Sequence, residues 1–205
     1  IEINTEMMEA FSEADCVCFG TLVQRYGISK NTLRELIHEA PDVVKFLDIN
    51  LRKKCYTATS IEDSLRMANI LKTNDEELWI TKYLLNLRHS KLKDLAQETI
   101  EKYKLDMLLC TLGENGAFCL TKENDFFYDP GYQISLGDTV GAGDAFSAGF
   151  VHYFMNEQSI EQALRFGNAA GAKVATTIGA TSPIGKAEIL EFMQGGTLRN
   201  VIAME

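Results

Sequence analysis

The chain has 205 residues, of which 46% are hydrophobic and 24% charged, and its formal net charge at pH 7 is −9. These proportions are typical of a soluble globular protein with a sizeable core, and the acidic balance excludes nucleic acid and anionic membranes as expected partners, because both require a basic surface. No apolar run approaches the roughly 20 residues of a membrane-spanning helix, and an odd set of five cysteines favours reduced thiols in a cytoplasmic protein.

The first half of the chain alternates between short apolar runs and segments of helical periodicity. In chain order these predict a strand at 16–20, a helix at 30–40, a strand at 43–50, a helix at 60–69, a strand at 70–74 and a helix at 90–104. Ser29 directly precedes the first of these helices and is its expected N-cap.

The second half continues the same alternation. In chain order it predicts a strand at 106–113, a hairpin or two edge strands over 116–120 and 125–134, and helices at 142–156, 159–176 and 186–194. Strands that alternate with helices predict an α/β protein, with a parallel sheet and helices on both faces. In such sheets ligands bind beyond the carboxyl ends of the strands, which is where the polar stretches DIN, KTNDEE and TLGENG fall.

The stretch GDTVGAGDAF, residues 137–146, matches neither the Walker loop nor the dinucleotide-binding fingerprint. Gly141 and Gly143 nevertheless let the backbone approach a ligand closely. The amides of residues 141–144 would point out of a helix N-terminus, which predicts an anion site. Asp144 beside a bound phosphoryl group could accept a proton from an attacking hydroxyl. The alternative is that Asp144 only complements the helix dipole.

The sequence DTVGAGDAF, residues 138–146, resembles the C-terminal signature of the ribokinase-like, or PfkB, family of sugar kinases. In that family Gly-Ala-Gly-Asp forms an anion hole, and its aspartate is the base. The resemblance implies an anion hole at Gly141, Ala142 and Gly143, with Asp144 as the catalytic base. It also implies a three-layer ribokinase-like fold and the ATP-dependent phosphorylation of a sugar hydroxyl.

Two further stretches resemble nucleotide-binding parts of the same family. CTLGENGAF, at 110–118, is similar to its nucleotide-binding turn, and ALRFGNAAGAKVATTIGA, at 163–180, is similar to the helix that lies along the adenine. The resemblance therefore implies nucleotide-binding roles for Thr111, Gly113, Gly116 and Asn168.

Asn74 and Glu77 fit two descriptions. An Asn followed three residues later by Glu, before an apolar run, is a helix capping box. The same residues resemble the family's Asn-x-x-Glu motif, which implies that they organise Mg²⁺ and its waters near the phosphates. Carboxylate and amide oxygens suit a magnesium ion that keeps most of its water. The two roles can coexist.

The segment DINLR places Asp48, Asn50 and Arg52 at i, i+2 and i+4, and thus on one face if the strand persists. A solvated edge is the alternative. Similar segments occur in the fructokinase and ketogluconate kinase branches, which implies that Arg52 lies near sugar or phosphate. CFGTLVQR, at 18–25, also resembles the fructokinase branch, with Thr21 in place of its serine.

Asp138 precedes the glycine turn. In many relatives this loop, together with carbonyls near the TIGAT segment at 177–181, holds K⁺, so the resemblance implies a metal role for Asp138. The alternative is a turn carboxylate that accepts a hydrogen bond from its own backbone.

The resemblance covers all 205 residues, but family members are longer. It predicts one α/β kinase domain over 1–205 that lacks the N-terminal sugar-binding and lid portion, and the opening IEINTEMM fits such a fragment. The expected ligands are ATP, Mg²⁺, K⁺ and a small sugar, fructose first, with 2-keto-3-deoxygluconate, ribose or a nucleoside as alternatives. A homodimer through the missing lid is expected. A non-catalytic nucleotide-binding relative is the rival class, against which intact Asp144 argues.

Overall fold

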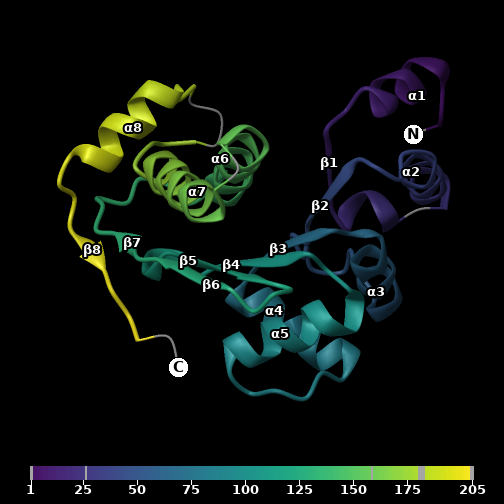
Figure 1. Ribbon diagram of the computed structural model, residues 1–205, viewed down its shortest axis with the longest axis horizontal. Helices are drawn as coiled ribbons and strands as arrows, with labels where there is room; N and C mark the ends of the chain where they lie inside the picture. Colours follow the sequence, from purple (N-terminus) through teal and green to yellow (C-terminus); the bar gives the residue numbers. More distant parts are fainter. Residues whose placement is uncertain (1, 26, 158, 180–182, 204–205) are drawn as a thin grey trace. The chain divides into compact units, whose positions relative to one another are not determined.

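The computed structural model describes residues 2–25, 27–157, 159–179 and 183–203 (Figure 1). The chain divides into two compact units. The first unit comprises Ile1–Leu109 and Leu120–Asn124, and the second comprises Cys110–Cys119 and Asp125–Glu205. No described helix is long and apolar enough to cross a membrane.

The central sheet confirms the predicted α/β class. Its strands follow the order β1-β2-β3-β4-β5-β6. They are β1 (Cys16–Phe19), β2 (Val44–Asp48), β3 (Ile70–Asn74), β4 (Met107–Thr111), β5 (Ala117–Thr121) and β6 (Phe126–Asp129). β2 pairs in parallel with both β1 and β3. Helices flank this mostly parallel sheet, which is the predicted arrangement.

The first unit surrounds its strands with helices. These are α1 (Thr5–Ser12), α2 (Gly27–Glu39), α3 (Ala58–Met67), α4 (Asp75–Leu85) and α5 (Leu92–Tyr103), with a 3₁₀ turn, η1, at Leu22–Arg25. Phe46 and Leu47 of β2 and Leu71 of β3 are fully buried. Parallel strands that are covered on both faces read as continuous apolar runs, which is why their positions were predictable.

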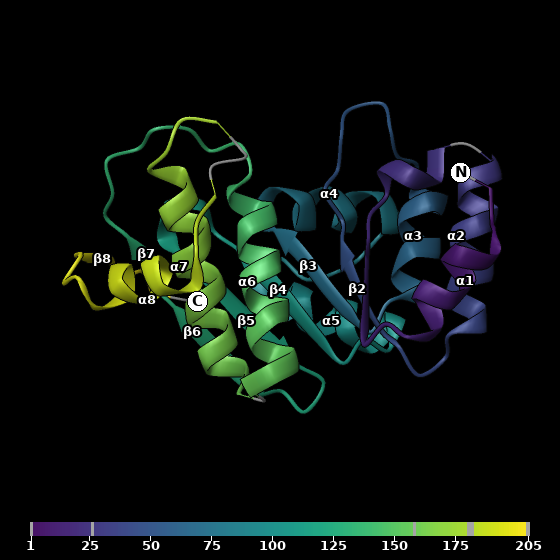
Figure 2. The ribbon, with the colours of Figure 1, turned by 90° about the horizontal axis from the view of Figure 1, so that it is seen from above.

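The second unit contains the three predicted C-terminal helices. Its elements beyond the sheet are the 3₁₀ turn η2 (Gly113–Asn115), β7 (Gly131–Tyr132), α6 (Ala142–Glu157), α7 (Ile160–Ala175), α8 (Lys186–Gln194) and β8 (Arg199–Asn200). β7 and β8 form a separate antiparallel pair, so the predicted segment 125–134 is divided between two sheets. α6 and α7 lie side by side, as the green ribbons of Figures 1 and 2 show.

Glycines allow α6 and α7 to approach closely. A Cβ atom at Gly167 would lie 2.8 Å from the carbonyl oxygen of Phe146, and one at Gly171 would lie 2.9 Å from that of Ala142. Both distances are too short for any side chain. The backbone of α7 therefore packs directly on α6, including Ala142, the first residue of α6. This contact fixes where the N-terminus of α6 lies within this unit.

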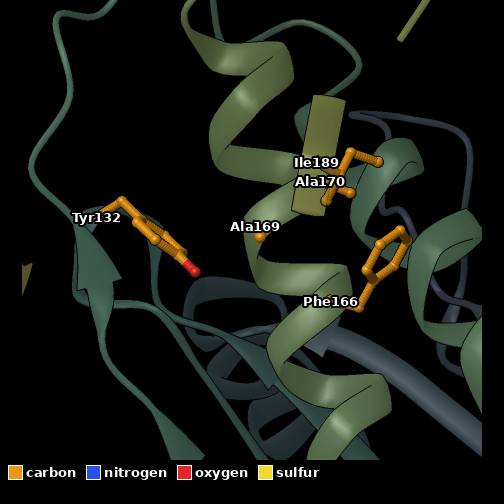
Figure 3. Close-up of a cluster of buried hydrophobic side chains, with 5 residues drawn as sticks. All are labelled: Tyr132, Phe166, Ala169, Ala170 and Ile189. Atoms are coloured by element: carbon orange, nitrogen blue, oxygen red, sulfur yellow. The ribbon is translucent and has the colours of Figure 1, made fainter. Parts of the chain in front are cut away.

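A hydrophobic cluster joins α7 to β7 and α8 (Figure 3). Its buried members are Tyr132, Phe166, Ala169, Ala170 and Ile189. The Tyr132 side chain points from β7 toward α7, and Ile189 of α8 lies beside Ala170. The cluster stabilises the C-terminal elements against α7.

Two local predictions are wrong. α2 begins at Gly27, so Ser29 lies within its first turn and is not its N-cap. The N-cap preference is a local effect of about 1 kcal/mol, which other contacts readily outweigh. β2 ends at Asp48, and Asn50 has a φ of 35°. Asparagine tolerates this left-handed conformation, which ends the strand alternation, so Asp48, Asn50 and Arg52 do not share a strand face.

Candidate active site

Asp48 and Lys72 form an ion pair at the carboxyl ends of β2 and β3 in the first unit. The Lys72 Nζ lies 3.1 Å from Asp48 Oδ2, and the two side chains are 8% and 18% exposed. A lysine buried to this degree requires a partner, and Asp48 supplies it. The charge of Lys72 is therefore offset within the protein.

Asn74 and Glu77 form the predicted capping box of α4. The Asn74 Oδ1 accepts a 2.8 Å hydrogen bond from the N–H of Glu77, and the Glu77 Oε2 accepts one of 3.0 Å from the N–H of Asn74. The second carboxylate oxygen of Glu77 accepts a 2.8 Å hydrogen bond from the N–H of Leu51. Glu77 therefore joins the start of α4 to the loop after β2.

Burial raises the pKa of the Glu77 carboxyl, and the two backbone hydrogen bonds and the nearby Lys72 charge oppose that rise. Among the described residues no group of three or more His, Cys, Asp or Glu side chains could hold a metal ion. Mg²⁺ commonly uses one or two carboxylates together with waters and substrate phosphates. Each Glu77 oxygen has a second lone pair beyond its backbone bond, so this donor set fits a hydrated Mg²⁺.

The loop after β2 carries Arg52, whose side chain is exposed. A buried hydroxyl holds this loop, because Thr21 Oγ1 donates a 2.9 Å hydrogen bond to the carbonyl of Ile49. Thr21 thus performs the contact that a serine at this position could also make. The structure leaves Arg52 accessible to a ligand.

The glycine stretch of the second unit opens α6 as predicted. Gly141 has a φ of 84°, a conformation that favours glycine, and its carbonyl accepts the first helical hydrogen bond from Ala145 at 2.9 Å. The N–H of Ala142 donates to Thr139. The next two N–H groups, of Gly143 and Asp144, have no partner inside a helix and face out of its N-terminus. Helix N-termini that present such N–H groups can bind anions, and the anion site at Gly141, Ala142 and Gly143 stays a prediction.

Asp144 lies in the first turn of α6, and its side chain is exposed. An exposed carboxylate next to free helix N–H groups can reach a ligand bound on those groups. The same position also complements the helix dipole. The geometry is therefore compatible with both roles predicted for Asp144.

Asp138 forms a turn with its own backbone. Its Oδ1 accepts a 3.0 Å hydrogen bond from the N–H of Val140. A Cβ at the preceding Gly137 would lie 2.6 Å from the carbonyl oxygen of Thr177, so this loop runs directly against the end of α7. Residues 180 and 181 of the TIGAT segment lie outside the described residues, and the K⁺ site stays a prediction.

The TLGENG turn, residues 111–116, joins β4 to β5 in the second unit. Gly113 and Gly116 have φ values of 58° and 94°, which explains why both positions are glycine. The N–H of Leu112 donates a 2.8 Å hydrogen bond to the carbonyl of Gly116 and closes the turn. A Cβ at Gly116 would lie 2.1 Å from the carbonyl oxygen of Asp129, so the turn packs on the end of β6.

Asn168 of α7 is bound to the end of β6. Its side chain is buried, and its Nδ2 donates to Asp129 Oδ2 at 2.5 Å and to the Pro130 carbonyl at 2.8 Å. The amide nitrogen is thus committed inside the protein. A role of Asn168 beside the adenine stays a prediction, and it would have to use the amide oxygen.

Sequence reasoning missed the residues that complete this contact. The Arg199 guanidinium forms a 2.5 Å ion pair with Asp129, whose side chain is 7% exposed. Asp129-Pro130-Gly131 carries a turn signal. Nothing local indicates that Arg199, 70 residues away along the chain, would approach it.

A helix N-terminus preceded by a glycine, within a mostly parallel α/β fold, is a common location for phosphate groups of ligands. The comparison with known families makes this specific. The model of the pfkB family carbohydrate kinases matches residues 2–187, and the chain belongs to that family.

Individual relatives and solved structures that resemble this chain are also kinases. The chain is 31% identical over 120 residues to the ATP-dependent ribose-1-phosphate kinase of Halopiger xanaduensis, which is 58% of this chain and 37% of that protein. A crystal structure of fructokinase with bound ATP from Xylella fastidiosa superposes with a TM-score of 0.80 at 22% identity, covering 91% of this chain and 63% of that one. A putative ribokinase II in complex with ATP and Mg²⁺ from E. coli gives a TM-score of 0.79 at 19% identity, covering 92% and 61%.

These matches define how far the likeness extends. The chain spans 37% of the length of the curated relative and 63% and 61% of the two solved structures. At these identities the structural likeness shows the fold alone. The family membership carries the functional interpretation.

Proposed function

We propose that the protein transfers the γ-phosphoryl group of ATP to a hydroxyl of a small sugar, and that fructose is the preferred acceptor. The observation that supports this most strongly is the first turn of α6. There the left-handed Gly141, the outward N–H groups of Gly143 and Asp144, and the exposed carboxylate of Asp144 occur together in a chain of the carbohydrate kinase family.

In this proposal the N–H groups of the first turn of α6 bind phosphoryl oxygens and offset the negative charge that develops on them. Phosphoryl transfer depends mainly on such positioning and charge stabilisation, and little on covalent chemistry by the protein. The glycines at 141 and 143 matter because a side chain would separate the ligand from these groups.

Asp144 is the proposed base. Its carboxylate accepts the proton of the attacking sugar hydroxyl as the oxygen–phosphorus bond forms and the bond to the leaving diphosphate breaks. An exposed carboxylate in the first helical turn is available for this step. A non-catalytic relative would have no need of a base here.

The proposed nucleotide contacts are Thr111, Gly113 and Gly116 in the TLGENG turn and Asn168 on α7. A Cβ at Gly113 would meet nothing within 4 Å, so the absence of a side chain there lets a ligand approach the backbone of the turn. In the first unit, Asn74 and Glu77 are the proposed partners of a hydrated Mg²⁺, which supplies positive charge. Arg52 is the proposed sugar or phosphate contact there.

The experiment that tests this function is a sugar panel on the full-length protein that carries this chain. ADP release is measured with fructose, ribose, 2-keto-3-deoxygluconate and a nucleoside, with and without Mg²⁺. Release that is highest with fructose and requires Mg²⁺ supports the proposal. Release with another sugar alone overturns the fructose assignment. ATP binding without release for any acceptor identifies a non-catalytic relative.

A further inference from the structure

The chain that follows α8 returns to the TLGENG turn. The match to the family model ends at residue 187, so β8 (Arg199–Asn200) lies beyond it. β8 pairs with β7 in antiparallel register, with Tyr132 opposite Arg199 and Gly131 opposite Asn200. Figure 1 shows this yellow strand beside β7. We call residues 197–203 the C-terminal segment.

Arg199 attaches this segment to the end of β6. Its guanidinium donates to Asp129 Oδ2 at 2.5 Å and to the Pro130 carbonyl at 2.5 and 3.2 Å, and it lies 3.8 Å from the centre of the Tyr132 ring. Asp129 is buried, so its charge requires donors, and Arg199 and Asn168 provide them. Charge-assisted bonds of this kind are the strong ones.

Two further contacts connect the C-terminal segment to the TLGENG turn itself. The Asn200 Nδ2 donates a 3.0 Å hydrogen bond to the carbonyl of Glu114. The Tyr128 hydroxyl donates to the carbonyl of Asn115 at 2.9 Å and accepts from the N–H of Ile202 at 3.3 Å. Two consecutive carbonyls of the turn are thus held from outside it.

The backbone conformation of the TLGENG turn is costly to order, so contacts from outside the turn stabilise it. Two of its residues are left-handed glycines, Gly113 and Gly116, and glycine loses more backbone freedom on ordering than any other residue. A Cβ at Gly131 would lie 1.7 Å from the carbonyl oxygen of Glu114, so the turn and the β6–β7 connection are in direct backbone contact. Whatever fixes residues 129–131 also fixes the turn.

We propose that the C-terminal segment positions the TLGENG turn for nucleotide binding, with Arg199 and Asn200 as positioning residues that need not touch the nucleotide. This rests on the proposed function, because it takes the turn to be a nucleotide site. The affinity for ATP then depends on a part of the chain beyond the residues that match the family.

The test measures ATP affinity of the full-length protein by calorimetry, together with KM for ATP and for the sugar. Asn200→Ala removes one hydrogen bond to the turn and is expected to weaken ATP binding roughly 3- to 10-fold. Arg199→Ala removes the charge-assisted contacts and is expected to weaken it at least about 10-fold. Arg199→Lys keeps the charge beside Asp129 but loses the planar fork, and an intermediate loss is expected. KM for the sugar stays unchanged in all three.

Arg165→Ala is the matched control. Arg165 lies on α7 in the same unit and forms an exposed pair with Glu161, with side chains 55% and 54% exposed. Such pairs contribute little, so ATP affinity stays within about two-fold of wild type. Hydrogen exchange provides the second readout. The amides of Leu112 and Gly116, which close the turn, exchange faster in Asn200→Ala than in wild type, while those of α6 do not change.

The outcomes separate the two proposals. Suppose that the wild-type protein binds ATP, and that Asn200→Ala and Arg199→Lys match it in ATP affinity and in the exchange rates of the turn amides. This result overturns the inference about the C-terminal segment and leaves the proposed function standing. A wild-type protein that binds no ATP overturns the proposed function and this role with it. A selective loss of ATP affinity in the folded Asn200→Ala variant supports both.

Discussion

The Glu77 carboxylate accepts a hydrogen bond of 2.8 Å from the backbone N–H of Leu51 and so connects the first turn of α4 to the loop after β2. Its other oxygen accepts from the N–H of Asn74, at the end of β3. The buried side chain of Glu77 therefore fixes the backbone at the carboxyl ends of both β2 and β3. The capping box and the loop that carries Arg52 are parts of the same structure.

Glu77→Gln is expected to lower the free energy of unfolding by about 1 kcal/mol, because an amide can accept from only one of the two backbone N–H groups. The NH₂ group of the glutamine would then face the remaining backbone N–H group, which is also a donor. Urea denaturation at pH 7 measures the change. Glu76→Gln is the control, since Glu76 lies in the same helical turn but is exposed, and its substitution should change stability by less than about 0.5 kcal/mol. Equal effects of the two variants would contradict the role of Glu77 in holding the loop.

The capping box shows what the sequence could predict. Asn74 and Glu77 are three residues apart, so their contact is local, and the strand before them is a continuous apolar run. The three C-terminal helices were predictable for the same reason, because their apolar periodicity is local. Gly143 and Asp144 lie in the first turn of α6, and the anion site there stays a prediction.

The unpredicted features depend on distant contacts or lack a local signal. Arg199 meets Asp129 only after the chain has passed through α6, α7 and α8. The same contact explains why Asn168 is bound inside the protein, which its place on a helix does not reveal. α1 has eight residues and none of them is buried, so its apolar pattern is too short to stand out in the sequence.

Asp144→Asn is expected to lower turnover at least about 100-fold, the lower range for loss of a positioned base. ATP affinity stays within a few-fold, because the anion hole consists of backbone N–H groups. Steady-state ADP release and calorimetry on the full-length protein measure the two quantities. If Asp144 only complements the helix dipole, the variant loses about 0.3–1 kcal/mol of stability and keeps its turnover. That result would show that Asp144 is not the base.

Gly143→Val places a branched side chain in the first turn of α6 and is expected to weaken ATP binding and reduce turnover together. Ala148→Val is the control on the same helix. Ala148 is exposed, so this variant reports only the poorer helix propensity of valine, about 0.5 kcal/mol, and keeps full ATP affinity. Normal affinity and turnover in Gly143→Val would contradict the anion hole.

Cys18 is expected to be the fastest thiol to alkylate in β1. The pKa of Cys18 is lowered to about 7 because the Cys16 side chain donates a hydrogen bond to its thiolate, and Cys18 is exposed. Its rate with iodoacetamide should therefore rise with pH and level off above about 8, since the thiolate is the reactive form.

Burial raises the pKa of Cys119 to about 12, so that thiol serves as the unreactive internal control. Mass spectrometry of quenched samples reports both rates. In Cys16→Ala the midpoint moves upward, and an unchanged midpoint would refute the role of Cys16.

Gly171→Ala tests the contact that places the α6 N-terminus. A helical glycine replaced by alanine normally gains up to about 1 kcal/mol from helix propensity. Here the new Cβ would lie 2.9 Å from the carbonyl oxygen of Ala142, a backbone atom in the first turn of α6 that cannot move without shifting the helix. Overpacking of this kind costs about 1–3 kcal/mol, so it outweighs the gain and the variant is expected to be less stable.

Because the strain falls on the first residue of α6, Gly171→Ala is also expected to weaken ATP binding, in proportion to how far the anion site moves. Gly27→Ala is the matched control, since it is the same substitution in a helix with nothing within 4 Å of the new Cβ, and it should be neutral or stabilising. Thermal unfolding and calorimetric ATP titration of both variants in the full-length protein provide the comparison. Should Gly171→Ala behave as Gly27→Ala does in both measurements, the close contact between α7 and the start of α6 would not control the position of the anion site.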